Sequence, residues 1–138
     1  MKINRDLVIT RLNKLNELLD ILNELKNIKK EDFLSNYKNY FTTQRTLEIC
    51  INICIDIGNH IVSLNNIERP ETFSDIIKIL AKHNVISEEL STRLIKMVRF
   101  RNLLGHFYLE IDNEIIYNIL QNDIKDFNSF REAILAKL

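Results

Sequence analysis

The sequence predicts an all-α protein, an up-and-down bundle of four long helices with one or two short helices. Only 2 glycines and 1 proline occur among the 138 residues, which leaves few breakers for the many turns of a β protein. Apolar residues recur at spacings of three and four, as on the buried face of a helix. The 46% hydrophobic and 28% charged content is typical of a globular protein. This length predicts a single domain over residues 1–138.

The first half of the chain predicts two long helices separated by one or two further helical turns near Glu31–Tyr37. One helix is expected over about residues 4–28, from its apolar stripe. That stripe comprises Val8, Leu12, Leu15, Leu19 and Leu22. The next, over about residues 42–65, has the widest stripe and is expected to be the most buried. Its apolar residues are Cys50, Ile51, Ile53, Cys54, Ile55, Ile57, Ile61 and Leu64. Gly58 inside this helix indicates close approach of another helix.

The second half is divided by helix-start signals. Thr72 and Asp75 fit a capping box that opens a short helix over about residues 73–83. Ser87 begins a helix that leads into residues 101–108, and the segment 107–112 is expected to be extended or irregular. Asp112 caps a last helix over about residues 113–137. Its apolar residues are Ile116, Leu120, Phe127, Phe130 and Ile134.

Charge and hydropathy restrict the function and the location. The formal net charge is zero and the pI is about 6.8, which argues against a protein that coats nucleic acid through a strongly basic surface. A local basic patch remains compatible with these values. No apolar run approaches the roughly 18 residues of a membrane span, and no apolar signal core follows the first residues. We therefore expect a cytoplasmic protein that makes no membrane contact.

The cysteines and two of the histidines are expected to be structural. Cys50 and Cys54 are the two cysteines of the chain, four residues apart on a predicted helix, and a buried apolar role is favoured. A metal site would need two more ligands, such as His60, so we expect no metal and no cofactor. His60 and His83 are expected to be structural or solvated.

The segment from Arg101 to Tyr108 concentrates the residues that can carry chemistry. Arg101 follows Val98 by three residues and Leu94 by seven, so it continues the apolar face and needs a partner or an interface. Asn102 and His106 are four residues apart and share one side of a helix. Gly105 either ends the helix and turns the histidine outward or allows close backbone contact, and the sequence leaves both open.

An arginine and a histidine held together can cleave RNA, although an isolated pair at this spacing is more often structural. RNA supplies its own nucleophile, the ribose 2′-hydroxyl. His106 is the candidate general base or acid, and Arg101 is the candidate for stabilising charge on the phosphate. Asn102 can orient the histidine or bind a phosphate oxygen. One histidine cannot readily serve as both acid and base in one turnover, but a two-fold dimer would bring two of them together.

Basic residues upstream of this segment are candidate contacts for RNA phosphates. Arg93, Lys96 and Arg99 precede it on the same predicted helix. They can form a track for the phosphate backbone, or they can simply make up a solvated helix face.

The chain resembles the HEPN superfamily and, within it, the HepT-like toxins of toxin–antitoxin pairs. The resemblance rests on Arg101 and Asn102, then three residues, His106, one residue and Tyr108. The lead-in Met97–Phe100 and the earlier segments Gln44-Arg45 and Asp56–Ile61 also match, so the likeness covers roughly residues 40–120. Gly105 departs from the aliphatic residue that often precedes the family's histidine. Arg45 joins the candidate phosphate contacts on the strength of this resemblance.

The resemblance implies a homodimer whose cleft is formed by both copies of the motif, with metal-independent endoribonuclease activity. It also implies neutralisation by a minimal nucleotidyltransferase (MNT) antitoxin, which in this family can transfer AMP to the motif tyrosine, here Tyr108. The added phosphates would compete with RNA for Arg101. The alternatives are a non-catalytic module that binds a nucleotide or a nucleotidyltransferase, and a purely structural helical bundle.

Overall fold

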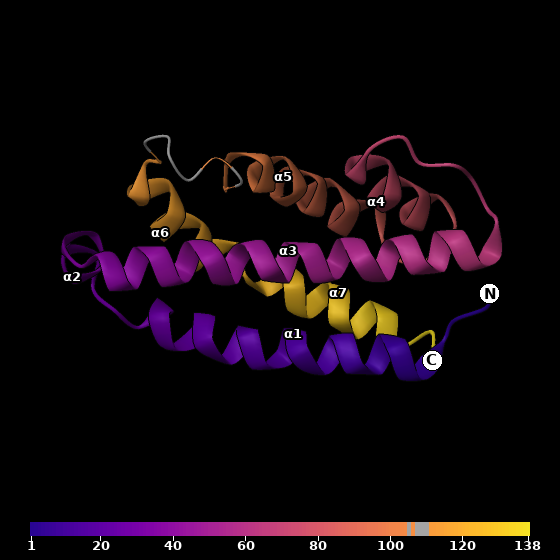
Figure 1. Ribbon diagram of the computed structural model, residues 1–138, viewed down its shortest axis with the longest axis horizontal. Coiled ribbons are helices and arrows are strands. Elements are labelled where there is room, and N and C mark those ends of the chain that lie inside the picture. The colour runs from indigo at the N-terminus through magenta and orange to yellow at the C-terminus, as the bar shows by residue number, and fades with distance from the viewer. Residues whose placement is uncertain (105, 107–110) are drawn as a thin grey trace.

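The computed structural model describes residues 1–104, 106 and 111–138, and it confirms an all-α bundle. This described part contains helices and no strand. The helices are α1 (Arg5–Lys26), α2 (Lys30–Ser35), α3 (Tyr37–Asn65), α4 (Phe73–Lys82), α5 (Glu88–Leu104), α6 (Asn113–Asn122) and α7 (Lys125–Leu135). The central helix α3 runs the length of the molecule, with α1 on one side and α4 and α5 on the other (Figure 1).

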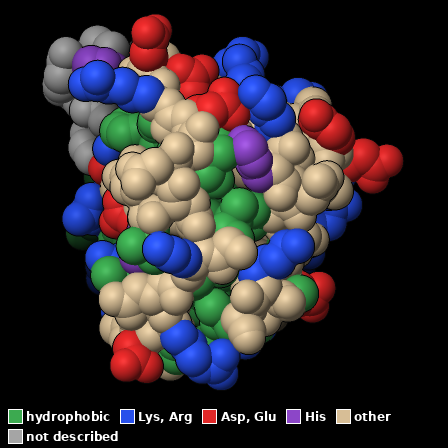
Figure 2. Space-filling view, turned by 90° about the vertical axis from the view of Figure 1, so that its right-hand side faces the viewer, with side chains coloured by type: hydrophobic (Ala, Val, Ile, Leu, Met, Phe, Trp, Pro, Cys, Tyr) green, Lys and Arg blue, Asp and Glu red, His purple; other side chains and the backbone are tan. Residues whose placement is uncertain are grey.

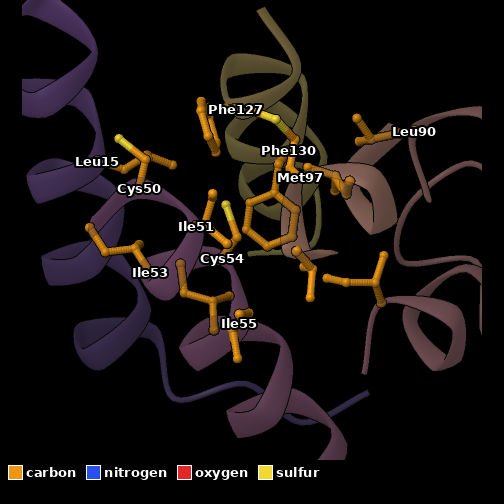
Figure 3. Close-up of a cluster of buried hydrophobic side chains, with 14 of the residues drawn as sticks. Leu15, Cys50, Ile51, Ile53, Cys54, Ile55, Leu90, Met97, Phe127 and Phe130 are labelled. Carbon is orange, nitrogen blue, oxygen red and sulfur yellow. The ribbon is translucent and has the colours of Figure 1, made fainter. Parts of the chain in front are cut away.

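The core surrounds α3, as its wide apolar stripe predicts. Phe127 and Phe130 of α7 lie among the isoleucines of α3 and side chains of α1 and α5 (Figure 3). Cys50 and Cys54 are buried in the same cluster, which confirms their apolar role. Leu64 is an exception, because its side chain is 41% exposed where α3 ends.

The length and composition of α3 are sufficient to cross a membrane, and it is the only helix of the described residues for which this is true. Its most apolar window has a mean hydropathy of 1.4, but 56% of that window is buried inside the bundle. Burial against neighbouring helices accounts for this hydropathy, since the core helix of a bundle is apolar on most of its faces.

Gly58 lies where α4 packs against α3. A Cβ atom at this position would meet Cγ2 of Ile76 at 2.7 Å and Cδ1 of Leu80 at 3.1 Å. The predicted close approach of another helix at this glycine is therefore confirmed, and α4 is that helix. The contact fixes the start of α4 beside α3, which positions the functional site described below.

The helix starts follow the signals read from the sequence. The Thr72 hydroxyl accepts a hydrogen bond from the Asp75 N–H at 3.1 Å, and the Asp75 carboxylate accepts from the Thr72 N–H at 3.2 Å, which completes the capping box. Ser87 Oγ accepts from the Leu90 N–H, and Asp112 Oδ1 accepts from the Glu114 N–H. Helix α3 begins at Tyr37, earlier than expected, because the Asn36 side chain accepts from the Lys38 N–H.

The expectation of one last helix over residues 113–137 is wrong, because the chain breaks between α6 and α7. The Asp123 N–H closes α6 on the Ile119 carbonyl at 2.9 Å. After the break, Asp126 points into the bundle, where its carboxylate pairs with Arg93 of α5. Both segments contact α1 and α3, and α6 also packs on α2 whereas α7 also packs on α5.

Acidic and basic side chains are interspersed on the face shown in Figure 2, around a band of hydrophobic side chains. This mixture agrees with the zero net charge of the chain. Binding of a polyanion to this face would have to depend on particular side chains.

Candidate functional site

Three helices meet at Arg101, in the last turn of α5. The guanidinium donates a hydrogen bond through Nε to Oδ1 of Asn52 on α3, at 2.6 Å. Its central carbon also lies 5.1 Å from the centre of the Phe73 ring, at the start of α4. The partner that we expected for this charge is therefore supplied by two residues, Asn52 of α3 and Phe73 of α4. Because a hydrogen bond and a cation–π contact both hold it, the guanidinium is ordered before any ligand arrives.

A polar stripe on α3 faces this site. None of its members was expected to be a site residue, although two of them lie in the segment Asp56–Ile61 that carried part of the family resemblance. Asn52, Asp56 and Asn59 follow one another at spacings of four and three, so they lie on one side of the helix. The signal was present, because these residues interrupt an apolar run of isoleucines and cysteines. Their grouping with Arg101 became evident only when α3 and α5 were placed side by side.

A pocket of about 450 Å³ opens between α3, α5 and the start of α4, and Phe73 in its wall connects it to Arg101. Asp56 and Asn59 of α3 and Asn102 of α5 contribute polar groups to it. Phe73 forms part of the wall and is 45% exposed, even though Arg101 lies over its ring. The remaining lining residues are Ile55, Pro70, Glu71, Thr72, Ser74, Ile76 and Val98. This volume falls within the usual range for small-molecule sites.

His106 is exposed and follows the end of α5 by two residues. Its backbone N–H donates to the Leu103 carbonyl at 3.1 Å. The structure thus places Arg101, Asn102 and His106 at one end of α5, and Asn102 and His106 are both exposed to solvent. Gly105 and Tyr108 lie outside the described residues, as do positions 107, 109 and 110 of the segment expected to be extended or irregular.

The four candidate phosphate contacts lie in different surroundings. Arg93 pairs through Nε with the buried Asp126 at 2.8 Å, and Arg45 lies 3.2 Å from Glu48. Lys96 and Arg99 are exposed on α5. They precede Arg101 by five and two residues, spacings that put them on the opposite side of the helix. Their contact with RNA stays a prediction.

The other histidines have structural partners. His60 Nε2 accepts a hydrogen bond from the Asn4 N–H at 3.1 Å, which ties the start of α1 to α3. His83 Nε2 lies 3.2 Å from Glu68 Oε2, and the Lys82 ammonium lies at the same distance. Hydrogen bonds from Lys82 and then His83 lower the pKa of Glu68. Among the described residues, no three His, Cys, Asp or Glu side chains group as metal ligands.

Comparison with known proteins places this arrangement in a family. The family model described as Ribonuclease HepT-like matches residues 13–134, which include both α3 and the arginine–histidine segment of α5. The chain belongs to the HepT-like ribonuclease family. The HEPN-type fold and the HepT-like resemblance predicted from the motif are confirmed.

Curated members of the HepT-like family share a moderate level of sequence identity with the chain. The mRNA nuclease HepT of Shewanella oneidensis is 36% identical over 107 residues, which cover 75% of this chain and 80% of that protein. The tRNA nuclease HepT of Aphanizomenon flos-aquae is 29% identical over 132 residues, which cover 96% of this chain and 90% of that protein. The two relatives are therefore named for different RNA substrates.

Solved structures of HepT-like proteins have the same fold. A toxin–antitoxin structure with AMP-PNP superposes with a TM-score of 0.88 at 27% identity, covering 95% of this chain and 98% of that one. The tri-AMPylated Shewanella oneidensis HEPN toxin in complex with its MNT antitoxin gives a TM-score of 0.87 at 27% identity, with the same coverage. Toxins of this fold thus occur in complexes with MNT antitoxins.

Proposed function

We propose that the chain is a metal-independent endoribonuclease toxin that cleaves RNA at a site shared by two copies of the chain. The observation that carries the proposal is the guanidinium of Arg101, held by Asn52 and Phe73 at the end of α5 where Asn102 and His106 are exposed. Membership of a ribonuclease family supports the reaction type. The runner-up is a non-catalytic module that binds a nucleotide or a nucleotidyltransferase through the same surface.

In this reaction the ribose 2′-oxygen attacks the adjacent phosphorus while the bond from phosphorus to the 5′-oxygen breaks. The imidazole of one His106 takes the proton of the 2′-hydroxyl, and a protonated imidazole from the second copy gives a proton to the leaving 5′-oxygen. The products are a 2′,3′-cyclic phosphate and a 5′-hydroxyl. Arg101 neutralises the charge on the non-bridging phosphate oxygens, and Asn102 orients the histidine or binds a phosphate oxygen.

The need for two imidazoles supports a homodimer. One chain supplies a single histidine at this site, whereas a two-fold dimer brings in a second copy of it without any further histidine in the chain. Arg93, Lys96, Arg99 and Arg45 are then the candidate contacts to flanking phosphates. Because the net charge of the chain is zero, the affinity for RNA must come from such local contacts.

Neutralisation by an MNT antitoxin is part of the proposal. Toxins with the same fold are found with MNT antitoxins, and one of them is tri-AMPylated. Transfer of AMP from ATP to the Tyr108 hydroxyl, with release of pyrophosphate, would add a phosphate close in sequence to Arg101, and this phosphate would compete with RNA for the guanidinium. A location in the cytoplasm, away from membranes, is also part of the proposal, and it is supported by a structurally similar Bacillus subtilis protein that is described as cytosolic.

The test is RNA cleavage by the purified chain in the presence of EDTA. We expect wild type to cleave, with cyclic phosphate at the new 3′ ends, and His106→Ala to be inactive while its circular dichroism and dimer mass stay unchanged. His83→Ala is the matched control, because His83 pairs with Glu68 away from this site. Cleavage by His106→Ala would remove this residue from the mechanism. Tight binding of the antitoxin without cleavage at any pH would favour the non-catalytic module.

A further inference from the structure

The pocket beside Arg101 has a charge opposite to that of the arginine. Among the described residues that line it, Asp56 and Glu71 are acidic and none is basic. Two carboxylates repel a phosphate group, so the pocket itself is a poor phosphate site. The guanidinium of Arg101, which lies over the ring of Phe73 in the pocket wall, is instead a good phosphate site. The adjacent surfaces are therefore suited to two different parts of one nucleotide, the phosphate and the base.

The remaining lining of the pocket suits a flat heterocycle. Phe73 is 45% exposed with one face against Arg101, and Ile55 and Val98 supply further apolar wall. Bases unstacked from single-stranded RNA are commonly received on aromatic side chains and read by hydrogen bonds along their edges. Asn59, Ser74 and Asn102 add amide and hydroxyl groups around the same space.

The carboxylate of Asp56 determines which base edge fits best. An ionised carboxylate only accepts hydrogen bonds, and it has two oxygens side by side. Guanine presents two adjacent donors, N1–H and the N2 amino group, which match those oxygens. Adenine and cytosine place an acceptor nitrogen beside their amino group, and uracil has one N–H between two carbonyl acceptors. Three of the four bases would therefore direct an acceptor towards the carboxylate.

We propose that this pocket is a guanine-binding subsite that selects the base next to the phosphate held by Arg101. Asp56 is its specificity-determining residue, and Phe73 is its stacking surface. The inference rests on the proposed ribonuclease function, and it names the feature of RNA that the site reads.

Nucleoside binding tests the pocket without involving catalysis. Guanosine, adenosine, cytidine and uridine are titrated into the isotope-labelled wild-type chain, and the binding is followed by NMR. These nucleosides lack a phosphate, so Arg101 contributes little. We expect guanosine to bind at least about tenfold more tightly than the other three, the discrimination typical of a bidentate base contact. Equal affinities for the four nucleosides would overturn the inference.

Two variants separate reading of the base from stacking. Asp56→Asn replaces one acceptor by a donor, so we expect guanosine to lose about tenfold in affinity while adenosine gains. Phe73→Leu should weaken all four nucleosides by a similar factor, because stacking does not distinguish the bases. Asp6→Asn on α1 is the control for loss of one exposed carboxylate away from the pocket. An unchanged guanosine preference in Asp56→Asn would contradict the assignment.

Cleavage mapping separates this inference from the function on which it rests. If wild type cleaves a mixed RNA next to guanosine and Asp56→Asn cleaves without that preference, both proposals are supported. If wild type cleaves with no base preference, the ribonuclease proposal survives and the subsite is wrong. If no RNA is cleaved while guanosine binding still depends on Asp56, the pocket stands and the ribonuclease proposal fails.

Discussion

Asn52 Oδ1 lies 2.6 Å from Arg101 Nε, and this hydrogen bond joins the middle of α3 to the last turn of α5. Since the contact uses Nε, it restrains the plane of the guanidinium. An arginine fixed in this way loses little entropy when it binds a phosphate. In the proposed ribonuclease, Asn52 would therefore act through Arg101, as a positioning residue.

The Asn52→Ala variant should lose activity and keep its fold. Without the acceptor, the guanidinium is held by Phe73 alone, and misplacement of a group that stabilises charge lowers kcat by roughly ten- to one-hundred-fold. Steady-state cleavage of a defined RNA measures this effect. Asn52→Asp keeps an acceptor but adds a carboxylate that neutralises the guanidinium and repels phosphate, so it should not restore kcat, whereas a substitution at the exposed Asn13 of α1 should change nothing. A kcat equal to wild type in Asn52→Ala would show that the hydrogen bond does not position Arg101.

Gly58→Ala should destabilise the protein even though alanine is the better helix former. The new methyl group would lie 2.7 Å from Ile76 Cγ2, and this overpacking costs about 1–3 kcal/mol. The gain in helix propensity offsets about 1 kcal/mol of that cost. We expect a net loss of about 1 kcal/mol in the free energy of unfolding, measured by urea denaturation. In the double variant Gly58→Ala/Ile76→Ala the clash is absent, so the two effects should be clearly less than additive.

Replacing Arg93 should lower the stability of the protein more than it weakens RNA binding. Its partner Asp126 has a side chain that is only 3% exposed, so Arg93→Ala leaves a carboxylate buried without its ion pair. Such a loss typically costs about 1–3 kcal/mol, which thermal and urea denaturation would detect. Arg99→Ala, at an exposed position on the same helix, is the matched control and should leave stability unchanged. If Arg93→Ala weakened RNA binding at full stability, the phosphate-contact role would be supported instead.

The two cysteines should be inert in the native protein. Burial raises the pKa of the Cys50 thiol to about 12, and burial together with the nearby Cys50 raises that of Cys54. At pH 8 both therefore stay as thiols, which are poor nucleophiles. We expect a disulfide reagent to modify both residues rapidly in denaturant. In buffer, labelling should be slow, because each thiol reacts only when the protein unfolds. Rapid labelling of the native chain would contradict their burial.

The start of α4 should lose stability in acid. Hydrogen bonds from the Glu71 and Thr72 backbone N–H groups lower the pKa of Asp75 below its usual 3.8. The ionised form is thus favoured by folding, and its contribution is present above about pH 4 and lost as the pH falls through the lowered value. Asp75→Asn should flatten the acid side of the plot of melting temperature against pH. Thr72→Ser, which retains the capping hydroxyl, should follow wild type.

The local features were determined by the sequence because each depends on neighbours along the chain. Thr72 and Asp75 form their capping box with each other. The stripe around Cys50 and Cys54 is buried because its residues are apolar and recur at the spacing of one helix face. The eight-residue motif identified the family through the type and spacing of its residues. Arg101 was also correctly expected to need a partner, since a charge on an apolar face cannot be left alone.

Only the tertiary structure decided which partners those residues obtained. Asn52 is 49 residues from Arg101, and Phe73 reaches the same guanidinium from a third helix, so no local pattern could link them. The ion pair between Arg93 of α5 and Asp126, just after the break between α6 and α7, likewise joins residues that are 33 positions apart. Helix periodicity specifies which face is buried, but the choice of neighbour on that face is made by the packing of the whole bundle.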